Sequence, residues 1–227
     1  MHIEAGVVIG TKILLSYATG VAVVGMGAKL AWEHIQESGA LSLLLRTIIS
    51  IGLVFTFFEV FPHYPIGVSE VHLILGTTLL MVFGVAPAMF GLALGLLLQG
   101  VTVAQFDLPQ YGINVTTLLA SMIILNMATK KIVPEGTAYK DISYTQMLKM
   151  SLVWEGAIVS WVAFWAFYGQ GFTAENIQNV LSFGGAYMLV VLLEPLIDLA
   201  ILSAVKAWYK SDSCNIMFNN RLTNCNA

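Results

Sequence analysis

The sequence predicts an all-α polytopic membrane protein with seven transmembrane helices, and its composition is the first reason. Of the 227 residues, 58% are hydrophobic and only 10% are charged, and the mean hydropathy is +0.82. The apolar residues also occur in repeated long runs, which is typical of helices that cross a bilayer. The net charge of −3 indicates no particular partner, and no basic patch suggests nucleic acid.

Polar links and turn-forming residues separate the predicted spans. The apolar run 71–103 exceeds the length of about twenty residues that one span needs, so we divide it at Gly84 and Pro87, which favour a turn. Ser69 is a suitable N-cap for a third helix that opens at Glu70. The seven predicted spans are Val7–Ala31, Leu41–Phe61, Val71–Phe83, Ala86–Val103, Asn114–Thr129, Met147–Tyr168 and one within Val180–Trp208.

Positive charges predict the orientation of these spans. The loops 62–70, 104–113 and 169–179 contain no lysine or arginine. Apart from Lys12, the basic residues fall at the other ends of the spans: Lys29, Arg46, Lys130, Lys131, Lys140, Lys149, Lys206, Lys210 and Arg221. We therefore expect the N-terminus outside and the C-terminus in the cytoplasm, in a multi-pass protein of the bacterial inner (plasma) membrane.

The domain organisation follows from the same pattern. Residues 1–210 form a single predicted transmembrane domain. Residues 211–227 are rich in asparagine and serine, and we expect a disordered, polar cytoplasmic tail.

The start of the chain, Met1-His2, suggests a metal site. The α-amine of Met1, the amide nitrogen of His2 and its imidazole close a five-membered and a six-membered chelate ring. Three nitrogens in one plane leave the fourth position of a square open. Square-planar nitrogen sites suit Cu(II) or Ni(II), and Co(II) is a further candidate. The N-terminus has no basic region and no A-x-A-like cleavage site, so we expect no removable signal peptide.

His72 is the candidate for the fourth ligand. It falls on the same predicted side of the membrane as the N-terminus, in the first turn of the predicted third helix, where the helix dipole disfavours its protonation. His63 also falls on that side and is a candidate capture ligand at the mouth of the site. His34 falls on the other side of the membrane and is set aside.

Several stretches resemble the CbiM/NikM family, the cobalt or nickel substrate-specific membrane subunits of energy-coupling factor (ECF) transporters. They are the N-terminal Met-His-Ile, the segment Gly67-Val-Ser-Glu-Val-His72-Leu-Ile-Leu-Gly76, the segment Gly91–Gln99, and Tyr111-Gly-Ile-Asn114. The resemblance implies a seven-helix fold whose N-terminus is drawn into the protein. It also implies that Met1, His2 and His72 hold the metal and that Asn114 lies near them.

The same resemblance implies a function that is not enzymatic. The chain would be the substrate-binding membrane subunit for uptake of Ni2+ or Co2+ in an ATP-driven ECF transporter. Its partners would be membrane lipid, a transmembrane scaffold subunit and separate ATP-binding subunits. The sequence contains no Gly-x-x-x-x-Gly-Lys-Ser/Thr phosphate loop, so we expect no bound nucleotide in this chain.

A second reading is an ion-coupled secondary metal carrier or a metal channel that works without ATPase subunits. Four acids inside the predicted spans are candidate proton relays: Glu59, Glu155, Glu194 and Asp198. The alternative is that these acids pair with Lys12 or Arg46 or lie near the interface. A seven-helix receptor is a third class, for which no specific feature is present.

Overall fold

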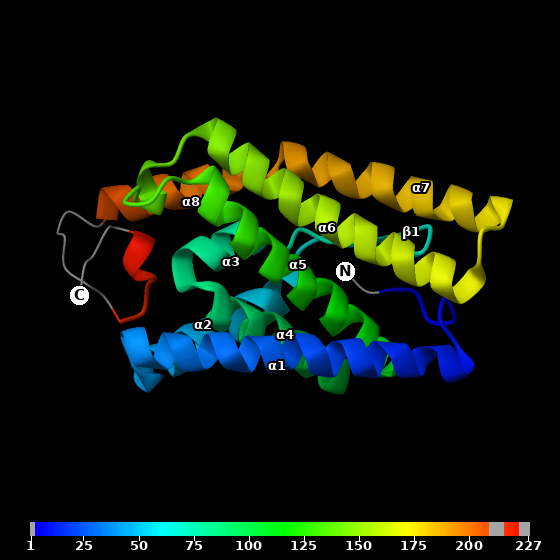
Figure 1. Ribbon diagram of the computed structural model, residues 1–227. Coiled ribbons are helices and arrows are strands. Elements are labelled where there is room, and N and C mark those ends of the chain that lie inside the picture. Colours follow the sequence, from blue (N-terminus) through cyan, green and yellow to red (C-terminus); the bar gives the residue numbers. More distant parts are fainter. Residues whose placement is uncertain (1–2, 209–215, 223–227) are drawn as a thin grey trace.

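The structure is a computed structural model and describes residues 3–208 and 216–222. The chain is built from eight α-helices and one short hairpin (Figure 1). The elements are α1 (Ile13–Ser38), α2 (Ala40–Glu59), β1 (Tyr64–Ile66), β2 (Ser69–Val71), α3 (Gly76–Phe83), α4 (Val85–Thr102), α5 (Tyr111–Ile132), α6 (Tyr144–Gln170), α7 (Ala174–Leu189) and α8 (Glu194–Trp208).

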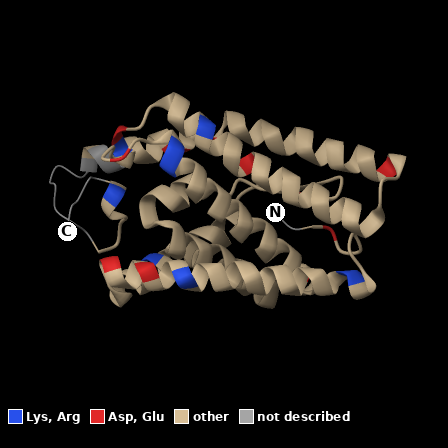
Figure 2. Ribbon diagram, in the orientation of Figure 1, with Lys and Arg blue, Asp and Glu red and all other residues tan. Residues whose placement is uncertain are grey.

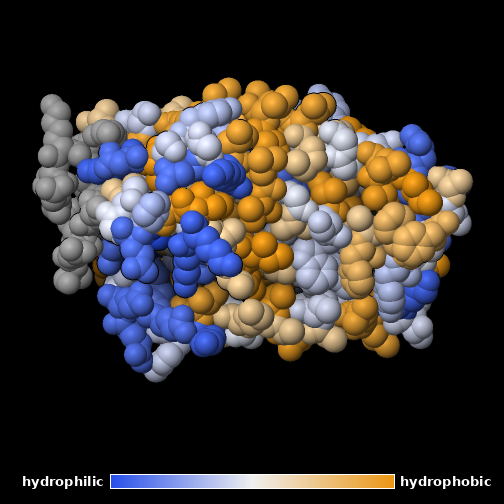
Figure 3. All heavy atoms as spheres, turned by 45° about the horizontal axis from the view of Figure 1, so that its top comes forward, coloured by the Kyte–Doolittle hydropathy of each residue, from blue (hydrophilic) through white to orange (hydrophobic). Residues whose placement is uncertain are grey.

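Six helical segments are long and apolar enough to cross a bilayer, which confirms the predicted class of polytopic helical membrane protein. Hydrophobic side chains cover the middle of the molecule and hydrophilic ones gather toward its ends (Figure 3). Most of the charged residues in Figure 2 lie toward the end where α1 and α8 finish. The six segments are Gly10–Ser38, Ala40–Glu59, Val85–Thr102, Gln105–Ile132, Tyr144–Gln170 and Ala174–Ala204.

The third predicted span is a buried half-helix and does not cross the membrane alone. Helix α3 has eight residues, a rise of about 12 Å, and every one of them is buried. The indole of Trp154 from α6 packs against its first residue, since a Cβ added at Gly76 would lie 2.2 Å from a ring carbon. Glycine at this position therefore permits the close approach of α3 and α6.

The residues ahead of α3 form a hairpin instead of the predicted helix start. Strands β1 and β2 pair antiparallel, and Gly67 between them has a φ of +66°, which a residue without Cβ adopts readily. The strand β2 includes Glu70, so the prediction of a helix that opens there is wrong, and α3 begins at Gly76. Pairing with β1 satisfies the backbone N–H and C=O groups of this segment, so they do not need a helix.

Acidic side chains of α8 bind the start of α3. The Oε1 atom of Glu194 accepts hydrogen bonds from the backbone N–H groups of Ile74 and Leu75, at 3.2 Å and 2.9 Å. Asp198, one turn further along α8, accepts hydrogen bonds from two threonine hydroxyls in the first turn of α3. These carboxyl groups supply acceptors for donors that the helix itself leaves unpaired.

The last predicted span, within Val180–Trp208, is interrupted. Helix α7 ends at Leu189, and α8 begins at Glu194 after a short 3-10 turn. Pro195 accounts for the break, because its ring clashes with the carbonyl group four residues earlier and it has no N–H to donate. The interruption places Glu194 at the start of a new helix, where it faces the loop before α3.

Part of the tail expected at 211–227 packs against the bundle. Residues 216–222 are described, and the backbone N–H of Asn219 donates to the carbonyl of Val82 at 2.7 Å. The carbonyl of Ile216 accepts hydrogen bonds from side chains of α2. These bonds join the segment to α2 and to the end of α3. The other residues of that tail lie outside the described part of the chain.

Candidate metal site

The first described residues are drawn into the bundle beside the hairpin (Figure 1). Ile3 pairs with Ser69 in an antiparallel bridge, and its N–H donates to Oδ1 of Asn114 at 3.0 Å. The N–H of Glu4 donates to the carbonyl of Val68 at 3.1 Å. Ile3 is fully buried. Hydrogen bonds to α5 and to the hairpin therefore fix the point from which the two preceding residues extend.

Further contacts hold the N-terminal segment against the end of α6. A Cβ added at Gly169 would lie 1.9 Å from the carbonyl oxygen of Val7, so only glycine permits this approach. The ammonium group of Lys12 donates to the carbonyls of Tyr168 and Gly169 at 3.0 Å and 2.9 Å. Lys12, the exception in the charge pattern, thus caps the last turn of α6, as cations commonly do.

His72 lies in the short connection between β2 and α3, not in the first turn of a helix. Its side chain is buried and packs edge-on against Phe58, with ring centroids 5.3 Å apart. The ring of His63 stacks on it at a centroid distance of 5.0 Å. The structure therefore brings together two of the predicted residues, while the argument from the helix dipole does not apply to His72.

Glu70 is a part of this site that the sequence analysis missed. Its Oε2 atom lies 2.9 Å from Nε2 of His72. In a neutral ring whose Nε2–H donates to the carboxylate, Nδ1 carries the lone pair that can bind a metal. Carboxylates commonly orient metal-binding histidines in this way. The signal in the sequence was the spacing of two residues, which places side chains of an extended chain on one face.

Negative charge gathers around the N-terminal segment. Partial burial, and then the nearby carboxylate of Glu70, raise the pKa of Glu4 above its usual range. A pair of close carboxylates gains from a cation placed near them, because the cation relieves their mutual repulsion.

Three of the five predicted site residues can be placed. His72 and His63 are in contact, and Asn114 binds the N-terminal segment at Ile3; Met1 and His2 lie outside the described residues. Within residues 3–208 and 216–222, no group of three or more His, Cys, Asp or Glu side chains could hold a metal ion. A metal site that includes His72 would therefore need ligands besides the described His, Cys, Asp and Glu side chains. The predicted additional ligands are nitrogen atoms of Met1 and His2.

Within the described part of the chain, the four intramembrane acids form no ion pair with Lys12 or Arg46. Lys12 and Arg46 donate hydrogen bonds to backbone carbonyls. Glu59 accepts a hydrogen bond from a glutamine amide of α4, and Glu194 accepts backbone N–H groups. Glu155 of α6 is also fully buried. Hydrogen bonding to the protein thus accounts for the burial of Glu194 without an ion partner.

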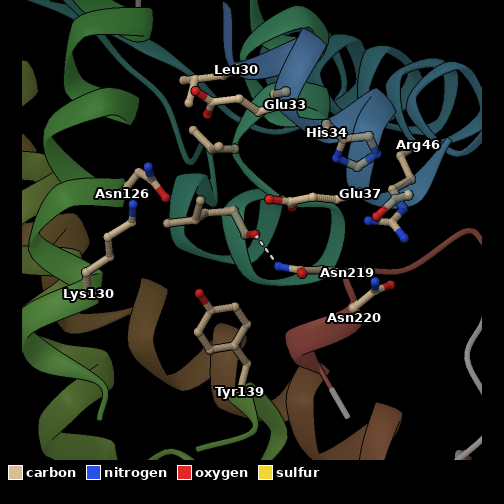
Figure 4. Close-up of a pocket in the computed structure, with 15 residues that line it drawn as sticks. Leu30, Glu33, His34, Glu37, Arg46, Asn126, Lys130, Tyr139, Asn219 and Asn220 are labelled. Carbon is tan, nitrogen blue, oxygen red and sulfur yellow. Dashed lines mark hydrogen bonds between the residues drawn. The ribbon is translucent and has the colours of Figure 1, made fainter. Parts of the chain in front are cut away.

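A polar pocket of about 260 Å³ lies at the other end of α3. Figure 4 shows His34 and Glu37 of α1 next to Arg46 of α2 on one side of it. The amide of Asn219 closes one side and donates to the carbonyl of Leu80 at 3.4 Å (Figure 4). His34 therefore belongs to this pocket and not to the surroundings of His72, as the sequence predicted by setting it aside.

Comparisons with known proteins identify what the chain resembles. A family model described as CbiM, cobalt uptake substrate-specific transmembrane region, matches residues 2–211. The crystal structure of a truncated transition metal transporter has a TM-score of 0.65 at 16% sequence identity and covers 92% of this chain and 97% of its own. That of a transition metal transporter has a TM-score of 0.63 at 18% identity and covers 96% of each chain. These two likenesses show a shared fold. No curated protein sequence matches the chain.

Proposed function

Because the chain belongs to the CbiM family of cobalt-uptake substrate-specific transmembrane regions, we propose that it captures nickel or cobalt as a divalent ion for an ATP-driven ECF transporter. Family membership makes it a transmembrane component of transition-metal uptake, which is not a class of enzyme. The metal is the transported substrate, and the proposed localisation is the bacterial plasma membrane.

The proposed ligands are the α-amine of Met1, the amide and imidazole nitrogens of His2, and the imidazole of His72. The observation that carries this proposal is the burial of Ile3 between Ser69 and Asn114. Two residues span at most about 7 Å, so the chain ahead of Ile3 starts close to the segment that leads to His72. A four-nitrogen set of this kind suits Ni(II) and, next to it, Co(II).

The surrounding residues have supporting roles in this proposal. Glu70 fixes the ring of His72 so that Nδ1 carries the metal-binding lone pair. His63 stacks on His72 and is exposed, so it can meet a hydrated ion first and pass it inward. Asn114 holds the backbone at Ile3 and acts on the metal through that contact.

The proposed partners are a transmembrane scaffold subunit and separate ATP-binding subunits. A family of transporter components fits membrane partners, and the sequence lacks a phosphate-binding loop. The competing carrier hypothesis needs acids that relay protons, whereas Oε1 of Glu194 accepts hydrogen bonds from two backbone N–H groups. Affinity purification from the native membrane separates the two readings, since only the ECF reading expects ATPase subunits to co-purify.

Metal analysis of the purified protein with its native N-terminus tests the proposal. N-terminal sequencing first establishes that Met1 is the terminal residue. We then expect about one nickel or cobalt ion per chain after dialysis against the metal. A chain that begins at Met1 and retains neither ion would contradict the proposed function.

The first prediction concerns orientation. We expect the N-terminus outside and the C-terminus in the cytoplasm, because the loops 62–70, 104–113 and 169–179 carry no lysine or arginine. A reporter that is active only in the cytoplasm, fused after Ala227, should give a strong signal. A reporter that is active only outside the cytoplasm should be silent at that position. The reverse pattern would place the candidate site on the wrong side for uptake.

The second prediction concerns Asn114. Asn114→Leu leaves the N–H of Ile3 without its acceptor in a buried place, which should cost about 1–3 kcal/mol of stability. Loss of this support should also weaken nickel binding by about 10–100-fold. Thr117→Val is the matched control on α5, because the Thr117 hydroxyl bonds only within its own helix. Isothermal titration of the two variants checks the difference, and equal affinities would remove Asn114 from the site.

A further inference from the structure

We propose that Glu194 is a positioning residue for the metal site, and that its carboxylate holds the backbone that follows His72 in its metal-binding conformation. The inference rests on the proposed role of His72 as a ligand. It assigns to an acid of α8 a task that neither the sequence pattern nor the family match indicated.

The connection between His72 and α3 needs acceptors that its own backbone does not supply. Residues 72–75 belong to neither a helix nor a strand, and Ile74 and Leu75 are buried. Because both residues are buried, water does not accept from their N–H groups, and an unsatisfied donor there is costly. Oε1 of Glu194 accepts from both, at 3.2 Å and 2.9 Å. A single carboxylate oxygen thus fixes two consecutive peptide groups.

The same connection contains a strained residue that needs such support. Within the described residues, Leu75 is the one non-glycine residue with a positive φ, at 54°. A leucine in the left-handed region is strained, and this conformation persists only where its surroundings impose it. The hydrogen bond from Leu75 N–H to Glu194 is one of those surroundings. Without it, we expect the loop to relax toward ordinary backbone angles.

Helix α8 is well placed to act as the fixed support. Asp198 lies one turn after Glu194 and accepts hydrogen bonds from the hydroxyls of Thr77 and Thr78. The two acids therefore join α8 to four of the five positions 74–78, namely 74, 75, 77 and 78. Ile74 is only two residues from His72, so a displaced loop would displace the imidazole as well. Metal sites tolerate displacements of only about 0.5 Å.

The experiment compares three substitutions of Glu194 in the full-length protein. Glu194→Gln keeps an oxygen at the same reach and removes the charge. Glu194→Asp keeps the charge and shortens the reach by one methylene. Glu194→Leu removes the acceptor and keeps the volume. If the two hydrogen bonds from Ile74 and Leu75 to this side chain position His72, nickel affinity should stay close to wild type in the Gln variant. It should fall about 10–100-fold in the Asp and Leu variants.

A spectroscopic readout separates positioning from general stability. The Cu(II) absorption spectrum of the Asp and Leu variants should shift toward that of His72→Ala, because the imidazole leaves the fourth position in both cases. Combining Glu194→Asp with His72→Ala should cost no more affinity than His72→Ala alone. Leu202→Ala, a core truncation on the same helix, controls for loss of stability and should leave the spectrum unchanged.

Three results would overturn the inference. They are a Gln variant as weak as the Asp variant, an Asp variant that binds like wild type, and an Asp variant whose effect adds fully to that of His72→Ala. Each is distinct from failure of the proposed function, in which the wild-type protein itself binds no nickel or is indifferent to His72→Ala.

Discussion

Addition of a Gly-Pro pair ahead of Met1 is expected to abolish tight binding of nickel and cobalt. The extension converts the α-amine of Met1 into a peptide nitrogen, and the proline nitrogen has no hydrogen to lose, so it cannot link the new amine to the chelate. A single added residue would not serve, because its amine would close a new five-membered ring with the Met1 amide. Because supporting residues alone change metal affinity by about 10–100-fold, loss of a chelating ligand should exceed that range. Equilibrium titration of the Gly-Pro-extended form against the native form measures the effect.

The position of Ile3 makes this experiment sensitive. Ile3 is fully buried and hydrogen-bonded to Asn114, so added residues cannot be accommodated by letting this segment slide outward without loss of those contacts. The matched control is the same Gly-Pro pair added after Ala227, and this form should bind the metal as the native form does. Undiminished binding by the N-terminally extended form would exclude the α-amine as a ligand.

Substitution of the histidines should give a graded series. His2→Ala removes a ring nitrogen together with the six-membered chelate ring and is expected to cost more than about 100-fold in affinity. His72→Ala opens the fourth corner to water and should cost less, about 10–100-fold. His63→Ala should leave the equilibrium affinity nearly unchanged, because His63 serves capture, and should slow association instead.

Titration and stopped-flow measurements on the three variants check this series. His34→Ala is the control, since His34 lies in the polar pocket beyond α3. If His63→Ala proves costly at equilibrium while His2→Ala does not, the stacked pair of His63 and His72 supplies the ligands, and the N-terminal chelate does not.

The hydropathy of the sequence was sufficient to predict the long helices but not the secondary structure around His72. Apolar runs of span length identify a membrane helix whatever they pack against. The segment Ser69–Val71 has an N-cap and apolar neighbours, yet it forms a strand because β1 pairs with it and Ile3 bridges to it. Ile3 is distant in the chain, and a local pattern of residues does not contain it.

Some residues of the candidate site were predicted from the sequence, and others were found only in the structure. His72 was predicted from its side of the membrane and Asn114 through the resemblance, and Asn114 binds the N-terminal segment at Ile3. Glu70 was treated as the start of a helix, although it binds the ring of His72. Glu194 was read as a packing or ion-coupling acid, because its task depends on backbone N–H groups 120 and 119 residues away. Contacts of that kind appear only once the helices are placed.

X-ray absorption at the nickel edge of the purified, nickel-loaded protein tests the central claim most directly. The account predicts a four-coordinate, square-planar ion with four nitrogen ligands and scattering from imidazole rings. Removal of His72 should replace one of these nitrogen ligands by oxygen. A six-coordinate site rich in oxygen ligands in the native protein would contradict the account.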